Sequence, residues 1–380
     1  MFSILPLEIL DKVLGYLDED DQLNLGQVNQ QLGRAFAYHA RGKYRKISFS
    51  QFKTYGNLKV ILELCGSTVI DVEIGFEGNA MDVIFKLIAK HCVNLETASV
   101  NITPLTFNAS KYVLAMKGLK TITLDFKIPD YEESDLIQYI NPDCKVLSVE
   151  NISVYQAENL RQLINLEELR VCEFYDSFQN IFHIVSDLKK LCVLCLRFCV
   201  QGCILIEENY YSDNQAENKE KFFECPELEV LKFDNCHILT PLPKCPKLKI
   251  LNLFNSHFDP RWDFGDTIAL YPSTLEHLML FYSARSTFVN EPTEKHFLNI
   301  LRVCKKLKCL SSSLDLIENI LLDSLDFIAI LKENGFNEER RFEINLYSFQ
   351  SIRAMNIEAA NYEVWNLITI NNFLLDDLKY

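Results

Sequence analysis

The sequence predicts an α/β solenoid, a curved parallel sheet with helices on its convex side, preceded by a small three-helix domain. Three observations support this fold class. From Leu228 onward, apolar residues fall at positions 1, 4, 6, 9 and 11 of a short segment. The same spacing begins again at Leu248 and at Leu275. Residues 1–42 do not follow the spacing, so they form a separate element.

This spacing is the leucine-rich-repeat template, in which each repeat supplies one short strand. Positions 4 and 6 alternate with polar neighbours, so their side chains point into the interior. One repeat cannot bury its apolar face alone, and neighbours must stack on it. Residues at position 4 are Ala98, Ile122, Leu147, Leu169, Leu194, Leu231, Leu251, Leu278 and Leu310, with weaker matches at Ile47, Val72 and Ile344. Their steps predict roughly ten to twelve repeats over residues 43–350.

Between the strands, helical periodicity predicts convex helices at Met81–Lys90, Ala109–Met116, Phe178–Val185, His296–Cys304 and Leu325–Leu331. The step from Leu194 to Leu231 is longer than its neighbours, and the extra sequence at Glu207–Lys221 is polar and acidic. We expect an exposed loop there, either a recognition arm or an inert insertion. After Tyr347 the pattern stops. Residues 351–380 are therefore expected to cap the last repeat with Trp365, Leu367, Phe373 and Leu374.

Charge and hydropathy exclude several classes of partner. The net charge of -14 disfavours nucleic acid and anionic membrane surfaces. No apolar run approaches the roughly 20 residues that span a bilayer. The start of the chain lacks the basic region of a signal peptide, and its end carries no prenylation signal. These features predict a protein of the cytoplasm, the nucleus or both.

Many of the 13 cysteines occupy a fixed place in the repeat. Four of them precede position 1 by three residues, namely Cys92, Cys225, Cys245 and Cys304, and Cys199 and Cys236 occupy position 9. We expect reduced thiols in the interior, because free cysteine is small and readily buried. The spacing of Cys192, Cys195, Cys199 and Cys203 resembles that of metal ligands. Cys195 should face outward and Cys199 inward, so we expect no metal and no other cofactor.

Motifs of enzymes are missing from the sequence. It contains no phosphate-binding glycine loop, no dinucleotide fingerprint, no His-Glu-x-x-His pair and no nucleophile elbow. Its seven histidines are scattered, and His237 and His257 each follow position 9, where we expect a turn. Active sites also assemble from distant residues, so an unrecognised enzyme stays as the weakest alternative.

The N-terminal residues predict three helices. Pro6 suits the first turn of a helix that carries Ile9, Leu10, Val13, Leu14 and Leu17 on one face. Asp20 or Asp21 is expected to cap a second helix with Leu23, Leu25, Val28 and Leu32, and a third covers about Gly33 to Arg41. A unit this small either caps the open end of the solenoid or docks on another protein.

The run Leu5 to Leu17, followed by Asp21, Leu23, Val28 and Asn29, resembles an F-box. The chain differs from the family pattern at Gln22, where the family favours leucine, and at Leu32, where it favours tryptophan. Together with the repeats, this resembles the F-box/leucine-rich-repeat family. The resemblance implies that a Skp-family adaptor binds to Leu5, Pro6, Ile9, Leu10, Val13, Leu14, Leu17, Leu23 and Val28.

Positions 3, 5 and 7 of each strand point away from the interior and are expected to pave the concave face. Asp125 and Glu150 make one part of it acidic. We expect the target to bind further along, at Arg170, Arg197, Lys232, Phe254, His277, Met279 and Phe281. The three basic residues suit a phosphorylated segment, and the aromatic residues an apolar flank. In the competing interpretation, Asp125, Glu150 and Asp234 neutralise the basic residues and leave no specific site.

The resemblance implies a non-catalytic substrate receptor of an SCF-type cullin–RING ubiquitin ligase. The F-box would bind the adaptor, and through it the cullin and RING subunits, while the repeats hold a protein target for proteasomal degradation. Two alternatives stay open beside the unrecognised enzyme. The chain is an F-box scaffold acting outside ubiquitination, or a plain repeat protein whose N-terminal helices only cap the solenoid.

Overall fold

The structure, a computed structural model, describes residues 5–52, 54–75, 81–127, 136–173, 178–198, 223–238, 241–258, 267–268, 270–281, 293–313, 317, 320–321, 324–348 and 362–374. The chain divides into two compact units, Met1–Leu166 and Glu167–Tyr380. The expected solenoid of residues 43–350 thus contributes to both units. Each unit is a parallel sheet with helices packed along one side.

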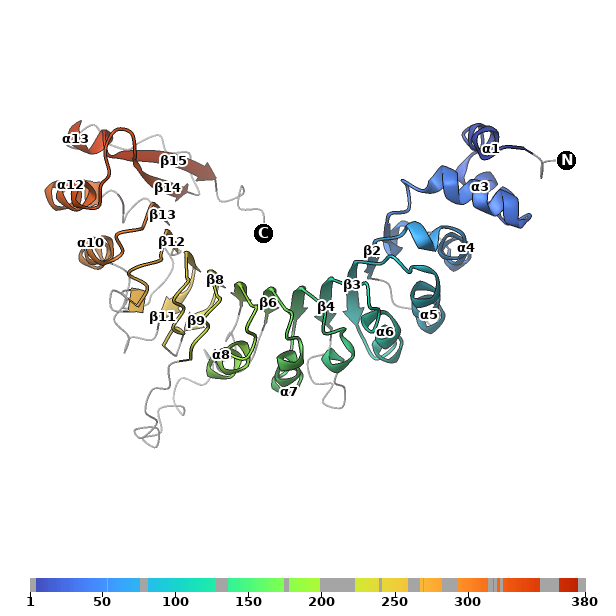
Figure 1. The fold of residues 1–380 in the computed structure, drawn as a ribbon, viewed down its shortest axis with the longest axis horizontal. Coiled ribbons are helices and arrows are strands. Elements are labelled where there is room, and N and C mark those ends of the chain that lie inside the picture. Colours follow the sequence, from blue (N-terminus) through green and yellow to red (C-terminus); the bar gives the residue numbers. More distant parts are fainter. Residues whose placement is uncertain are drawn as a thin grey trace. The chain divides into compact units, whose positions relative to one another are not determined.

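The first unit begins with three helices, α1 (Leu7–Leu14), α2 (Glu19–Gly26) and α3 (Gln30–Ala40). Parallel strands then follow in sequence order, β1 (Lys46–Ser48), β2 (Asp71–Ile74), β3 (Thr97–Ile102), β4 (Thr121–Phe126) and β5 (Val146–Glu150). Between them run α4 (Tyr55–Cys65), α5 (Met81–His91), α6 (Phe107–Leu114) and, after β5, α7 (Val154–Glu158). These four helices lie on one side of the strands (Figure 1). Short 3-10 turns complete the connections at Phe49–Gln51, Gly66–Thr68, Ile137–Tyr139 and Asn159–Gln162.

The second unit repeats this plan. Its sheet contains β6 (Glu168–Cys172), β7 (Val193–Arg197), β8 (Val230–Asp234), β10 (Ile250–Phe254), β12 (His277–Phe281), β13 (Cys309–Ser313), β14 (Phe342–Ser348) and β15 (Ile368–Leu374), in that order. Its helices are α8 (Phe178–Val185), α10 (Glu294–Val303), α12 (Ser324–Glu333) and α13 (Tyr362–Trp365). Two further short strands, β9 (His237–Ile238) and β11 (His257–Phe258), pair with each other beside the main sheet.

The predicted repeat pattern is confirmed by strand register. Within the first unit Ile47 aligns with Val72, and the alignment continues through every later anchor to Leu147. Within the second unit the alignment runs from Leu169 to Ile344. All of the anchor side chains are at most 1% exposed. The apolar interior therefore lies between the sheet and its helices. The helix-free face carries positions 3, 5 and 7 and is called the concave face below.

Several elements differ from the expectation. We expected the repeat pattern to end after Tyr347, but β15 pairs in parallel with β14 and aligns Ile370 with Ile344. Residues 368–374 thus extend the sheet rather than fold over it. His237 and His257 lie in the short strands β9 and β11 instead of in turns. The five predicted convex helices are all present, with ends that shift by a few residues. None of the described helices is long and apolar enough to cross a bilayer.

The second and third helices begin at other residues than the sequence analysis predicted. The cap of α2 is Asp18, rather than Asp20 or Asp21, and its carboxylate accepts a hydrogen bond from the backbone N–H of Asp21 at 2.9 Å. The third helix begins earlier than expected, because the side chain of Asn29 caps α3 through the N–H of Leu32 at 3.0 Å. Val28 therefore lies between two helices. Short polar side chains set both starts, since they satisfy otherwise unpaired N–H groups.

Candidate protein-binding surfaces

The three N-terminal helices pack around a small core. Leu10 and Leu14 of α1 and Leu23 of α2 are buried, together with Leu32 and Phe36 of α3. We expected an adaptor to contact the first three of these side chains. They are at most 4% exposed and pack between the three helices. Leu32 fills this core where the family pattern favours a larger tryptophan.

The accessible part of the expected adaptor surface is smaller. Ile9 is 43% exposed and Val28 is 66% exposed, and Pro6 is exposed as well. The remaining expected residues, Leu5, Val13 and Leu17, are half-buried. Leu7 and Tyr16 are also exposed apolar residues in the segment that resembles an F-box, and they were not among the expected contact residues.

Polar contacts fix this helical surface. The side-chain amide of Gln22 donates to the carbonyl oxygens of Leu14 at 3.0 Å and Leu17 at 2.9 Å, at the end of α1. The glutamine thus adds a second donor to the Leu14 carbonyl, which already accepts from the N–H of Leu17 at 3.0 Å, and it also bonds to the Leu17 carbonyl, which a leucine cannot do. His39 Nδ1 lies 2.8 Å from Asp11 Oδ1 and joins α3 to α1.

Two glycines, which lack a side chain, allow these helices to lie close to the first repeat. A Cβ at Gly26 would lie 3.0 Å from Cβ of Phe36 and 3.2 Å from Cδ1 of Leu64 in α4. A Cβ at Gly33 would lie 3.0 Å from Cδ2 of the same leucine. The hydroxyl of Tyr44 also donates to Glu19 Oε1 at 2.9 Å, and burial is the largest cause that raises its pKa. The helices are therefore packed directly against α4.

The concave face of the first unit is acidic and rich in hydroxyl groups. Its carboxylates are Asp71, Glu73, Asp125 and Glu150, and its hydroxyl groups belong to Thr97, Ser99, Thr121, Thr123 and Ser148. Asp125 and Glu150 lie side by side in the register. Asp125 forms an ion pair with Lys127, and Asp71 pairs with Lys46 at 3.3 Å.

The concave face of the second unit has a different composition. Strand register places Arg170, Cys195, Lys232, Asn252 and Met279 in one row, from position 5 of successive strands. The position 3 row contains Glu168, Val193, Val230, Ile250 and His277. The position 7 row contains Cys172, Arg197, Asp234, Phe254 and Phe281. These three rows together are called the grid below. The grid has three basic and two acidic residues, whereas the concave face of the first unit is acidic.

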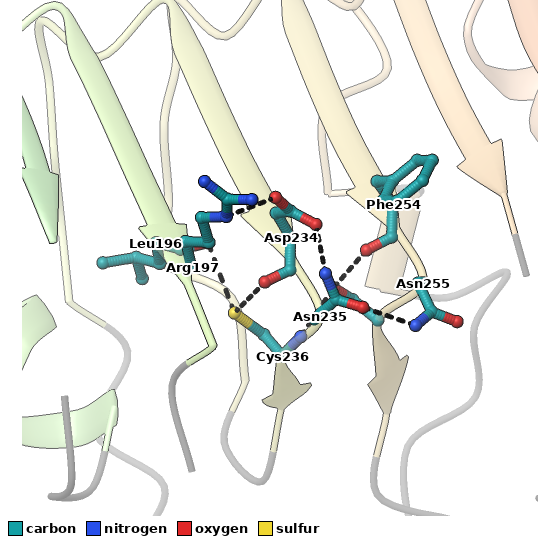
Figure 2. Close-up of polar contacts among 8 residues, drawn as sticks. Leu196, Arg197, Asp234, Asn235, Cys236, Phe254 and Asn255 are labelled. Carbon is teal, nitrogen blue, oxygen red and sulfur yellow. Dashed lines mark hydrogen bonds and ion pairs between the residues drawn. The ribbon is translucent and has the colours of Figure 1, made fainter. Parts of the chain in front are cut away.

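The three expected basic residues do not form one patch. Arg170 pairs with Glu168 on its own strand, with 2.6 Å between Nε and Oε1. Arg197 pairs with Asp234 on the next strand, at 3.0 Å (Figure 2). Burial raises the pKa of Asp234, and the Arg197 charge and the Asn235 hydrogen bond oppose this. Lys232 is exposed and has no ion-pair partner among the described residues. Two strand spacings separate it from Arg170, about 10 Å.

The expected aromatic residues stack on each other. The rings of Phe254 and Phe281 are parallel within 10° and their centroids are 5.0 Å apart. Phe281 is buried, so only Phe254 presents part of its ring to solvent. Met279 is half-buried and His277 is exposed. Of the seven expected target-binding residues, Arg170, Lys232 and His277 are thus exposed, Arg197, Phe254 and Met279 are half-buried, and Phe281 is buried.

A left-handed residue follows position 7 in five repeats. These residues have φ between 45° and 58° and are Asn151, Glu173, Phe198, Asn235 and Asn255. Their conformation turns the N–H groups of Asn235 and Asn255 toward the carbonyl oxygens of Phe254 and Phe281, at 2.9 Å and 2.6 Å. The Asn255 amide also donates to Asn235 Oδ1 at 2.5 Å (Figure 2). Asparagine tolerates this region better than most residues. Three of the five are asparagine, and each directly precedes position 9 of its repeat.

The cysteines form no metal site among the residues that the structure describes. Cys195 faces outward as expected, while Cys199 and Cys203 lie outside the described residues, as does the insertion at Glu207–Lys221. The interior thiols of Cys65, Cys92 and Cys144 are protonated, because burial raises the pKa of each to about 12. Cys236 fills position 9 and donates its S–H to the Leu196 carbonyl at 3.3 Å (Figure 2).

We expect alkylation to separate these thiols. At pH 8, Cys65, Cys92 and Cys144 should react with iodoacetamide at least about a hundredfold more slowly than Cys192, because a thiol of such high pKa is rarely ionised. Cys192 is half-buried and donates its S–H to the Lys190 carbonyl at 3.3 Å. Peptide mass spectrometry over time measures the rates. Equal rates in native and urea-unfolded protein would contradict the predicted burial.

A family model described as F-box domain matches residues 2–42. The predicted F-box resemblance is thereby confirmed. A solved structure, the leucine-rich repeat-containing protein LegL7 of Legionella pneumophila, is 10% identical and aligns with a TM-score of 0.42, over 87% of this chain and 91% of that one. No curated protein matches the chain. Residues 2–42 therefore carry an F-box domain, and the strands that follow repeat with the leucine-rich spacing described above.

Proposed function

We propose that this protein is the substrate receptor of an SCF-type cullin–RING ubiquitin ligase, acting in the cytoplasm or the nucleus. The observation that carries the proposal is the F-box match at residues 2–42, directly followed by stacked repeats. Proteins that carry an F-box generally bind Skp-type adaptors. The adaptor would join the chain to the cullin and RING subunits.

The helical domain is the adaptor surface in this proposal. Pro6, Ile9 and Val28 offer exposed apolar groups, and Leu5, Val13 and Leu17 border them. Leu10, Leu14 and Leu23 support that surface from the core. Apolar side chains that lose contact with water on docking supply the favourable free energy.

The concave face of the repeats is the target surface. Extended concave surfaces are the usual binding faces of solenoids. The ligase would then work by proximity, because holding target and ubiquitin-loaded enzyme together raises their effective concentration. The chain itself supplies no catalytic group in this mechanism.

Reconstitution tests the proposal. The full chain is mixed with a Skp-family adaptor, cullin and RING subunits, and the complex is isolated by size exclusion. We expect a stable complex that transfers ubiquitin to a bound target, and accumulation of that target in cells after proteasome inhibition. A complex with the adaptor that changes no protein's turnover would favour a scaffold acting outside ubiquitination. Absence of adaptor binding would leave a plain repeat protein.

A further inference from the structure

We propose that the concave face over β7, β8, β10 and β12 binds an extended peptide segment that places one carboxylate on Lys232 and apolar side chains around it. The inference deepens the proposed function and rests on it in one respect, because it takes the concave face as the target surface. Target recognition would then depend on an acidic residue flanked by aliphatic or aromatic residues.

The first argument is the distribution of charge. Arg170 and Arg197 are both neutralised within the grid, by Glu168 at 2.6 Å and by Asp234 at 3.0 Å. Lys232 is exposed and has no ion pair with a described residue. Its row neighbours, Cys195 and Asn252, carry no charge at neutral pH. On a chain of net charge -14, Lys232 is thus the positive charge of the grid that a ligand carboxylate could pair with.

The second argument is the surroundings of that centre. In the position 3 row, Val193, Val230 and Ile250 lie side by side on three adjacent strands and are all half-buried. On the next strand, the half-buried ring of Phe254 lies at position 7, and Met279 lies two strands from Lys232 in the same row. Apolar neighbours exclude water when a ligand covers them, and an ion pair formed there is stronger than one in bulk solvent.

A third observation indicates a main-chain contact beside the lysine. The side-chain oxygen of Asn252 is buried and has no hydrogen-bond partner among the described residues. An unpaired buried acceptor is costly. If this amide rotated toward a ligand, its oxygen could accept a hydrogen bond from a peptide N–H. Such a contact suits an extended segment lying across the strands.

The same geometry favours a carboxylate over a phosphate. Two-pronged phosphate recognition uses arginine, whose planar guanidinium gives two parallel hydrogen bonds. Both arginines of the grid already hold carboxylates, and Asp234 and Glu168 would repel a doubly charged group. Lysine offers a compact point charge that one carboxylate balances. A phosphorylated target is therefore the competing outcome.

The test begins with a phage-displayed library of random linear peptides, selected on the full-length protein. The variants are Lys232→Met, which keeps the length of the side chain and removes its charge, and Lys306→Met as the matched control. Lys306 is also exposed and has no ion-pair partner among the described residues, but it lies in the turn before β13. Selected peptides are then synthesised with their acidic residue intact, amidated, or replaced by phosphoserine, and their affinity is measured by fluorescence anisotropy.

We expect selected peptides to share one Asp or Glu beside apolar residues. Loss of a charge-assisted contact should weaken binding about tenfold, whether in Lys232→Met or in the amidated peptide. The two changes together should cost no more than either alone, and Lys306→Met should bind like wild type. Peptides without an acidic residue, an unchanged affinity of Lys232→Met, tighter binding of phosphoserine, or no enrichment over the Lys232→Met selection would each overturn the inference. Adaptor binding, measured on the same preparations, reports separately whether the proposed function fails.

Discussion

Replacing Ile9 and Val28 by aspartate should reduce binding of a Skp-family adaptor by more than about a hundredfold, because a carboxylate buried in an apolar interface without a partner costs several kcal/mol. Ile9 is 43% exposed and Val28 is 66% exposed, so neither change disturbs the core of the helical domain. Each single variant should show part of the loss. Isothermal titration calorimetry with purified adaptor measures the affinity, and circular dichroism shows whether the fold is retained.

A matched control is available in the same unit. Val93 is 64% exposed and Ile164 is 61% exposed, and both lie outside the F-box. The variant Val93→Asp with Ile164→Asp introduces the same charges on comparable apolar residues. It should bind the adaptor like wild type. If Ile9→Asp with Val28→Asp still binds the adaptor, or if the control loses binding equally, the F-box surface is not the docking site.

Gly66→Ala should destabilise the first unit by about 1–3 kcal/mol, the usual cost of overpacking a filled interior. Gly66 is buried at the start of a 3-10 turn after α4. A Cβ there would lie 2.7 Å from Cβ of His91 and 2.9 Å from its carbonyl carbon and oxygen. Two of these atoms belong to the backbone at the end of α5, so relief requires the helix to move. Urea unfolding followed by circular dichroism measures the change in the free energy of unfolding.

Gly42→Ala serves as the control, because no atom lies within 4 Å of its added Cβ. That substitution should leave the free energy of unfolding unchanged, or raise it by about 0.4–1 kcal/mol by restricting the unfolded chain. Equal stabilities of the two alanine variants would show that α4 and α5 are not in the close contact described.

The repeat fold was predictable because one regular spacing fixes which side chains are buried. Ile47, Val72 and Ile344 were weak matches to the template, yet Val72 aligns with Ala98 and Ile344 with Leu310, and Ile47 follows in register with Val72. The last strand, β15, was missed because position 6, which is apolar in the template, is Asn372 in this strand. Periodicity detects a strand through its buried face, and an edge strand carries less of that signal.

The binding surfaces were predictable only in outline. An apolar arc on α1 shows that the helix has a buried face, but not which apolar residues meet the other helices. Leu10 and Leu14 therefore looked equivalent to Ile9, although they are buried in the core. Likewise, Arg197 and Asp234 are far apart in sequence and meet only through the register of β7 and β8. Charge pairing across strands depends on that register, which the sequence alone does not give.

Alternation along each strand has a further consequence for how such a protein can change. The inward anchors that hold the repeats and the outward residues of the grid are different side chains of the same strands. Mutations at Lys232, Val230 or Met279 would alter what is recognised at little cost to folding, since surface substitutions usually shift stability by no more than about 0.5 kcal/mol. The concave face is thus free to diverge quickly between related genes, and one unchanged scaffold can acquire new targets through a handful of substitutions.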